Sequence, residues 1–140
     1  MTREEIIAFF ARRQDAFARH DAPALAAAHA EDCVMESPWA GTVTGREAIE
    51  QVYRHWFTAF PDVVYDGEEL LIDGNRVAQI ATFVGTDMGG FMGLPATGRP
   101  FRLPLVLVCT LNEHQIVRQR SIYDFTGMLV QIGMLKAKPA

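Results

Sequence analysis

Cysteine is scarce in this sequence, and two signals for membrane or secreted proteins are missing. The 140 residues contain two cysteines, Cys33 and Cys109, too few for a disulfide framework. We expect both to be buried, reduced thiols of a cytoplasmic protein. The longest mostly apolar run, Leu103 to Leu111, is far shorter than the about 20 residues that a membrane helix needs. The first residues also lack the apolar core of a signal peptide. We therefore expect no membrane partner.

Positive charge is limited as well. The chain has 13 Lys and Arg residues against 17 Asp and Glu residues, which gives a net charge of −4, and its basic residues form no cluster. Proteins that bind nucleic acid normally carry such a cluster, so we expect no nucleic-acid partner. Apolar residues make up 49% and charged residues 21%, as in an ordinary globular protein. The chain shows no repeat and no linker, so we predict one domain over residues 1–140.

Helical spacing dominates the first part of the chain. Thr2 and Glu5 have the spacing of a capping box, which begins a helix. Phe10 and Phe17 then lie on one apolar stripe, and Arg13 falls between them on that stripe. Further along, Thr44 and Glu47 repeat the capping-box spacing. The predicted order is a helix from Thr2, a short helix from Asp21 to about His29, a strand over 33–37, a loop, and a helix from Thr44 to Pro61.

Strand composition follows Pro61. We predict strands over residues 63–72, 77–87, 100–111 and 116–124, the first with a bulge near Asp66, and then a short amphipathic helix. Consecutive strands joined by short turns are antiparallel. The sequence thus predicts an α+β fold of order α-α-β-α-β-β-β-β with a short C-terminal helix. Its curved antiparallel sheet packs on three helices as a cone-shaped half-barrel, with a pocket between the layers.

The strand from Leu103 to Leu111 is apolar on both of its alternating faces. A strand with one face in water normally alternates apolar and polar residues. One face can cover the helices and the pocket, and a second copy of the chain would cover the other. We therefore expect a homodimer through the outer sheet face. The alternative is a hydrophobic outer face without a partner, and the pattern leaves open whether Leu107 or Val108 points outward.

Three segments resemble one protein family. They are DMGGFMGLPATGR at residues 87–99, FTAFPD at 57–62, and a close in which Asp124 precedes GMLVQIG at 127–133. Together they resemble SnoaL-like proteins, a family of the nuclear-transport-factor-2-like, ketosteroid-isomerase-like superfamily. The resemblance implies the cone fold and a place among the polyketide cyclases. Those enzymes close a ring by an intramolecular aldol reaction without a metal or cofactor.

The resemblance implies one acid/base residue, Asp124, which matches an Asp near the end of the last strand in the cyclases. A carboxyl group beside apolar walls has a raised pKa and can exchange protons near neutrality. The alternative roles of Asp124 are a helix cap or a partner of Arg120. The cyclases also use a His on the preceding strand, where Thr110 is the polar residue here. The active-site residues of ketosteroid isomerases and limonene epoxide hydrolases are not matched either, and Ser121 replaces the last-strand Asp of the latter.

Three readings of function stay open. The first is a cofactor-free cyclase, isomerase or hydratase that acts on a small hydrophobic, oxygen-bearing molecule. The alternatives are a non-catalytic small-molecule-binding or accessory protein of the same fold, and an epoxide hydrolase-like enzyme. We expect no metal. The candidate substrate-contacting residues are Trp39, Tyr53, Trp56, Met88, Phe91 and Met92 for apolar contact, and Arg13, Glu36, Thr110, Ser121 and Tyr123 for polar contact.

Each candidate also has an ordinary structural role. Tyr53 and Trp56 are equally suited to a plain core. Glu36 can form an ion pair with an arginine, and Arg13 can extend its charge from the helix edge into solvent. Tyr123 alternates with Ile122, so it shares a face with Ser121. If that face is concave, the Tyr123 hydroxyl can donate a hydrogen bond to a substrate oxygen.

Overall fold

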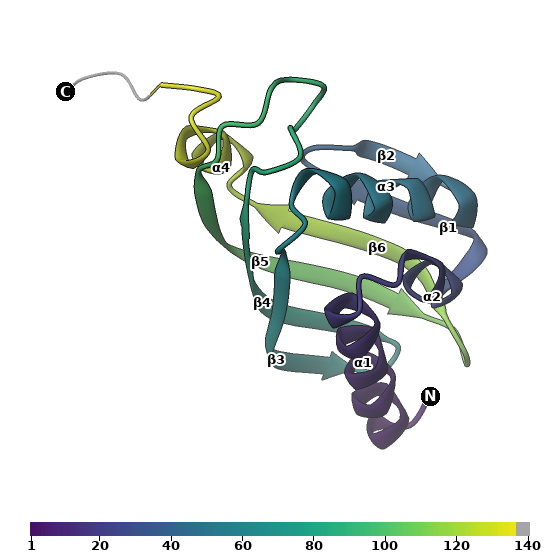
Figure 1. The fold of residues 1–140 in the computed structure, drawn as a ribbon. Helices are drawn as coiled ribbons and strands as arrows, with labels where there is room; N and C mark the ends of the chain where they lie inside the picture. The colour runs from purple at the N-terminus through teal and green to yellow at the C-terminus, as the bar shows by residue number, and fades with distance from the viewer. Residues whose placement is uncertain (137–140) are drawn as a thin grey trace.

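The structure, a computed structural model, describes residues 1–136 (Figure 1). Its helices are α1 (Arg3–Ala18), α2 (Ala22–Ala27), α3 (Arg46–Ala59) and α4 (Phe125–Gln131). Its strands are β1 (His29–Ser37), β2 (Gly41–Thr44), β3 (Val64–Asp73), β4 (Arg76–Thr86), β5 (Pro100–Leu111) and β6 (Ile116–Tyr123). The predicted α+β class and the order of the long elements are confirmed.

The first two helices begin as the sequence predicts. The Thr2 side chain accepts a hydrogen bond from the Glu5 backbone N–H, and the Glu5 carboxylate accepts one from the Thr2 backbone, which completes the capping box of α1. Asp21 caps α2 by accepting from the Ala24 N–H. These local hydrogen bonds satisfy amide groups that have no partner within a helix. They fix where α1 starts and therefore which of its residues face the core.

The second predicted capping box is wrong. Helix α3 begins after Gly45, which has a φ of 97° and makes no side-chain cap. Thr44 instead pairs with Val34 at the end of β2, a strand that replaces the predicted loop. The four residues of β2 form a hairpin with β1, so Thr44 is committed to the sheet. A residue with positive φ is then needed to turn the chain into α3, and glycine adopts that conformation without strain.

The sheet is mixed, not fully antiparallel as predicted. Its six strands lie in the order β2-β1-β6-β5-β4-β3. Every neighbouring pair is antiparallel except β1 and β6, which run parallel. The rule of short antiparallel turns holds for consecutive strands, but α3 and four further strands separate β1 from β6 in the chain. The predicted bulge in β3 is confirmed as a register shift between Gly67 and Glu69.

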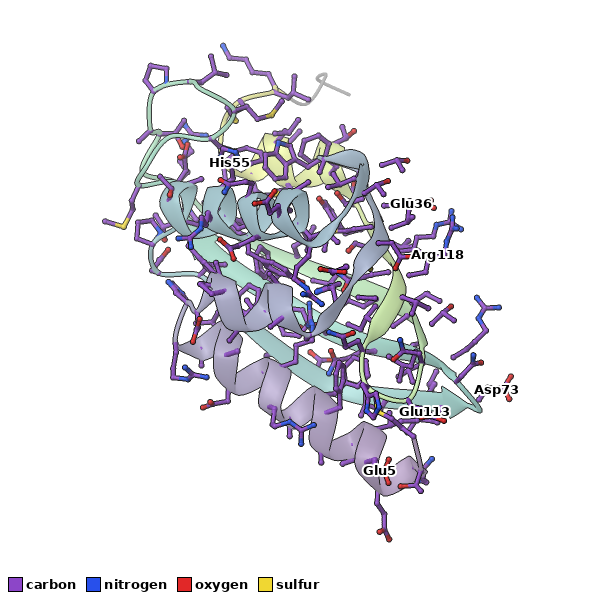
Figure 2. The ribbon with its side chains drawn as sticks, turned by 90° about the vertical axis from the view of Figure 1, so that its right-hand side faces the viewer. Glu5, Glu36, His55, Asp73, Glu113 and Arg118 are labelled. Carbon is purple, nitrogen blue, oxygen red and sulfur yellow. The ribbon has the colours of Figure 1, made fainter. Side chains whose placement is uncertain are left out.

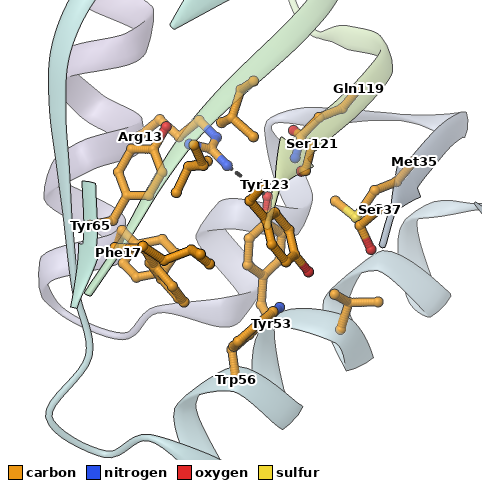
Figure 3. A pocket seen from close by; sticks show the side chains of 15 residues that line it. Arg13, Phe17, Met35, Ser37, Tyr53, Trp56, Tyr65, Gln119, Ser121 and Tyr123 are labelled. Carbon is orange, nitrogen blue, oxygen red and sulfur yellow. Dashed lines mark hydrogen bonds between the residues drawn. The ribbon is translucent and has the colours of Figure 1, made fainter. Parts of the chain in front are cut away.

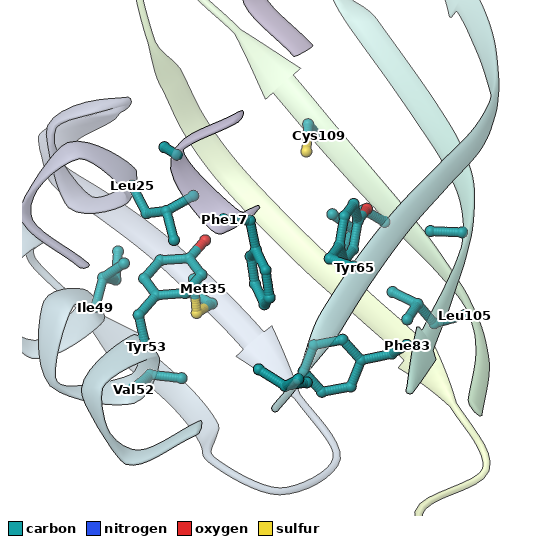
Figure 4. Packing of buried hydrophobic residues seen from close by; sticks show 14 of the residues in the cluster. Phe17, Leu25, Met35, Ile49, Val52, Tyr53, Tyr65, Phe83, Leu105 and Cys109 are labelled. Atoms are coloured by element: carbon teal, nitrogen blue, oxygen red, sulfur yellow. The ribbon is translucent and has the colours of Figure 1, made fainter. Parts of the chain in front are cut away.

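Helices α1, α2 and α3 cover one face of the curved sheet, and α4 lies beside the loop that follows β4 (Figure 1). The core fills the space between these layers (Figure 4). Phe17 of α1 is its central aromatic residue. The ring centroid of Phe17 lies 5.1–6.4 Å from four other ring centroids, those of Tyr53, Phe57, Tyr65 and Phe83. The stripe that the sequence indicates on α1 therefore joins this helix to both α3 and the sheet.

The structure settles the orientation of β5. Leu103, Leu105 and Leu107 point inward and are at most 8% exposed. Val106 and Val108 alternate with them and lie half-buried on the outer sheet face. Both cysteines are free and buried, as expected. Within residues 1–136, no helix combines the length and apolar character needed to cross a bilayer.

Candidate functional site

A cavity lies between the concave face of the sheet and helices α1 and α3 (Figure 3). Its free volume is about 70 Å³. Apolar walls with a few polar groups are typical of small-molecule sites. The lining residues are Arg13, Phe17, Met35, Ser37, Val52, Tyr53, Trp56, Tyr65, Phe83, Leu103, Leu105, Leu107, Gln119, Ser121 and Tyr123.

Helix α1 contributes the one arginine of this lining. The Arg13 side chain is 5% exposed. Its Nη2 donates a hydrogen bond of 3.0 Å to the Tyr53 hydroxyl, and its guanidinium lies 5.3 Å from the centroid of the Tyr65 ring. The Tyr65 hydroxyl in turn donates to Gln79 Oε1 at 2.6 Å. Arg13 therefore does not extend into solvent. It is held inside the cone by contacts with α3 and β3.

Strand β6 contributes the hydroxyl of Tyr123. This face of β6 is concave, so the condition for a hydroxyl directed at a ligand is met. Burial raises the pKa of Tyr123 to about 12, although Ser37 and the Trp39 backbone lie near enough to temper the rise. The hydroxyl oxygen is buried and neither neighbour completes a hydrogen bond with it. The Tyr123 hydroxyl is thus a protonated donor without an acceptor.

Gln119 connects the cavity to a buried histidine. His29 Nδ1 lies 2.9 Å from the Leu25 carbonyl oxygen, and Nε2 lies 3.0 Å from Gln119 Oε1. Burial, and then the charge of Arg13, lower the pKa of His29 to about 4, so the ring is neutral at pH 7. Nδ1 then donates its proton to the Leu25 carbonyl oxygen, and the neutral Nε2 accepts a hydrogen bond once the Gln119 amide is turned to present its nitrogen.

The cavity collects five of the predicted contact residues and leaves the others elsewhere. The five are Arg13, Tyr53, Trp56, Ser121 and Tyr123. Trp39 and Phe91 do not line it. Their ring centroids lie 5.3 Å and 5.7 Å from that of Trp56, so both pack against this residue. These two large apolar loop residues therefore cover Trp56, and not a ligand.

Met88 and Met92, also predicted to contact the substrate, do not line the cavity either. They are 62% and 55% exposed and contribute nothing to the cavity. The buried carboxylate of Asp87 fixes their loop by accepting from the backbone of Gly90 and from both the backbone and the hydroxyl of Thr97. This arrangement directs Phe91 into the core, so the neighbouring methionine side chains remain outside.

Two polar candidates lie on the outer sheet face. Thr110 alternates with the buried Cys109 and Leu111, so it points away from the cavity. Glu36 alternates with the inward-facing Met35 and Ser37, and its carboxylate forms an ion pair with Arg118 of β6 (Figure 2). The alternative interpretation of Glu36, an arginine-paired carboxylate, is the one the structure supports.

Asp124 also lies outside the cavity. Its side chain is exposed, and its Oδ1 accepts a 2.9 Å hydrogen bond from the Gly127 N–H as the N-cap of α4. The expectation of a desolvated carboxyl group in the pocket is therefore corrected. Strand β6 ends with Tyr123 facing inward, so the next residue begins the turn into α4.

Several lining residues were missed. The leucines of β5, Phe17 and Tyr65 carried only core signals in the sequence. Gln119 could have been found, because it lies two residues before Ser121 and four before Tyr123, on the same face of a predicted strand. Ser37 of β1 also lines the cavity and was not among the predicted contact residues. Within residues 1–136, no group of three or more His, Cys, Asp and Glu side chains is arranged to hold a metal ion.

The cap formed by Asp124 can be tested by substitution. Asp124→Ala removes the bond to Gly127 and should lower the free energy of unfolding by about 1 kcal/mol. Asp124→Asn keeps an oxygen acceptor, so its stability should stay near that of the wild type. Urea unfolding of the three proteins measures this. Loss of activity in Asp124→Asn without loss of stability would instead indicate that Asp124 acts as an acid or base in the reaction.

The buried histidine predicts a pH dependence. In the unfolded chain the pKa of His29 is about 6.5, whereas in the folded protein it is about 4. The stability gained from a neutral ring is therefore complete above about pH 6.5 and is lost as the pH falls toward 4, by at most about 1.4 kcal/mol per pH unit. Urea unfolding at several pH values should show a shallower slope in His29→Gln. The exposed His114→Gln should keep the wild-type slope, and equal slopes in all three proteins would contradict the prediction.

Comparison with known proteins identifies the family and the fold of this chain. The model of the SnoaL-like polyketide cyclase family matches residues 9–132. The structure of AclR, a proposed hydroxylase from Streptomyces galilaeus, is similar with a TM-score of 0.84 and 23% identity over 99% of this chain and 87% of that one. TsrD from Streptomyces laurentii also gives 0.84, with 21% identity over 96% and 99%.

IdmH, a proposed polyketide cyclase from Streptomyces antibioticus, gives a TM-score of 0.76 with 28% identity over 90% of this chain and 96% of that one. No match was found among curated protein sequences. The family match covers most of the chain, including every strand of the sheet. With its NTF2-like fold, the chain belongs to the SnoaL-like polyketide cyclase family.

Proposed function

We propose that this chain is a cofactor-free enzyme of the cyclase, isomerase or hydratase type. Its substrate is a small, largely apolar molecule that bears oxygen, such as a polyketide. The observation that carries the proposal is the Tyr123 hydroxyl, a buried donor without an acceptor in a cavity with apolar walls. A donor left unsatisfied lowers the stability of the free protein. A substrate oxygen would complete the missing hydrogen bond.

The chemistry follows from where charge develops. When a carbon next to a carbonyl loses a proton, negative charge builds on the carbonyl oxygen, and a donor aimed at that oxygen lowers the barrier. In a ring closure the enolate carbon then attacks a second carbonyl carbon, whose oxygen takes up a proton from water, so the proton released in the first step is returned. With a pKa of about 12, the Tyr123 hydroxyl stays protonated for this task. In this proposal the carbon releases its proton to water, and Asp124, being the cap of α4, takes no part.

Turnover of a short linear tetraketide ester tests the proposal. The wild type should form the ring-closed product faster than buffer, as measured by liquid chromatography and mass spectrometry. Tyr123→Phe removes only the hydroxyl, so the rate should fall by about 10²-fold while stability is kept. Asp124→Asn is the matched control and should keep the rate. A rate in Tyr123→Phe equal to that of the wild type would remove Tyr123 from the chemistry.

The second candidate is a non-catalytic binding or accessory protein. One observation favours it, since none of the described residues that line the cavity is a carboxylate or a histidine. The same experiment separates the two functions. A binding protein would raise its melting temperature with the ester, and the ester would be recovered unchanged at the buffer rate.

We also propose that two copies of the chain associate through the outer sheet face. Val106 and Val108 of β5 lie half-buried on this face, and Leu71 of β3 and Ile122 of β6 are 52% and 48% exposed on it. A second copy would remove these side chains from water, and the burial of apolar surface would favour association. No other part of residues 1–136 covers this face.

Charge substitution tests the dimer. Val108→Asp would place an unpaired charge in the interface and should weaken association by at least about tenfold, or about 1.4 kcal/mol. Ile7→Asp adds the same charge at an exposed position of α1 and should leave association unchanged. Sedimentation at micromolar concentration measures both variants. A monomeric wild type would show the proposal to be wrong.

A further inference from the structure

Arg13 is a buried charge without a counter-charge. Within residues 1–136 the ion pairs involve Arg19, Arg54 and Arg118, whose side chains are at least half exposed, and Arg13 takes part in none of them. An arginine side chain stays protonated in proteins. A buried cation without an acidic partner lowers the stability of a fold. Packing alone therefore does not explain why an arginine occupies this position.

The groups around Arg13 do not supply a negative charge at neutral pH. Burial raises the pKa of Tyr65, and it raises the pKa of Cys109 to about 12. The imidazole of His29 is neutral. Tyr53 accepts one hydrogen bond and Tyr65 offers the face of its ring. These contacts stabilise a guanidinium in part, but none of them carries a charge of opposite sign.

Arg13 lines the cavity and has donors without a partner. Nε and Nη1 are both buried and have no hydrogen-bond partner. Together they carry three of the five N–H groups of an arginine side chain. Arg13 and Tyr123 line the same cavity, from α1 and β6. A ligand in the cavity would lie beside a cation from α1 and a separate neutral hydroxyl from β6.

We propose that the ligand of this cavity is a small, mostly apolar organic anion whose charged oxygen pairs with Arg13. The anion is a carboxylate or an acidic enol in its ionised form, because both present an oxygen that accepts from a guanidinium. The free volume of about 70 Å³ favours a small molecule. The inference rests on the proposed function only in that the cavity binds a ligand.

Matched pairs of probes test the charge. Benzoate is compared with neutral benzamide, and cyclohexane-1,3-dione, largely ionised at pH 7.5, with its neutral methyl enol ether. Calorimetric titration of the wild type should show at least one of the two anions binding about tenfold or more tightly than its neutral partner. The pair that shows the preference distinguishes a carboxylate ligand from an enolate. Equal affinity within both pairs, or binding of neither anion, overturns the inference.

Two arginine variants locate the effect. Arg13→Met should lose the preference for the anion, whereas Arg12→Met removes the same charge from an exposed neighbour on α1 and should keep it. Unliganded Arg13→Met should melt no lower than the wild type, because an uncompensated buried charge is gone. Arg13→Lys, which keeps the charge, should retain part of the preference. An anion preference that persists in Arg13→Met overturns the inference.

The outcomes separate this inference from the proposed function. Anion preference without turnover supports the charge pairing and the binding-protein alternative. Turnover of the neutral tetraketide ester at an unchanged rate in Arg13→Met, together with no anion preference in the wild type, supports an enzyme and overturns the anionic ligand.

Discussion

The packing of Phe17 against two helices and the sheet is the interaction on which the rest of the structure depends. Its ring touches aromatic residues of α3, β3 and β4, so it sets the distance between the helical layer and the concave sheet. It also forms part of the cavity wall. A smaller residue there would let the layers approach and fill the cavity, and a larger one would separate them. The hollow in this cone is therefore a consequence of how its core is packed.

The same constraint accounts for the position of Arg13. Residues four apart on a helix lie on one face, so the turn that buries Phe17 also brings Arg13 inside. An apolar residue at position 13 would be the expected choice for stability. The fold instead holds a guanidinium against the Tyr65 ring and the Tyr53 hydroxyl and leaves the remaining donors open. Local violations of this kind are expected at functional sites.

The sequence was sufficient for the elements whose signals are local. The capping box at Thr2, the stripe through Phe17 and the bulge in β3 are all decided by neighbours in the chain. The parallel pairing of β1 with β6 depends on residues about 80 positions apart, and no local pattern reports it. Thr44 is an example in which local and long-range signals disagree, because the residue suits both a helix cap and a strand end. In the structure it pairs with Val34 and ends β2.

Register explains why one predicted contact residue lines the cavity and its neighbour does not. Asp124 has the more reactive side chain, and a motif places it near the end of the last strand. Along β6 the inward positions are Gln119, Ser121 and Tyr123, and the strand ends there. The carboxylate is then free to accept from Gly127 and begin α4. Because side chains alternate across a strand, a single step in position exchanges a carboxylate for a phenol at the cavity wall. Two of the polar groups at the cavity wall are accordingly donors, a hydroxyl and a guanidinium, and in the functions proposed above they would stabilise a substrate that develops or carries negative charge on oxygen.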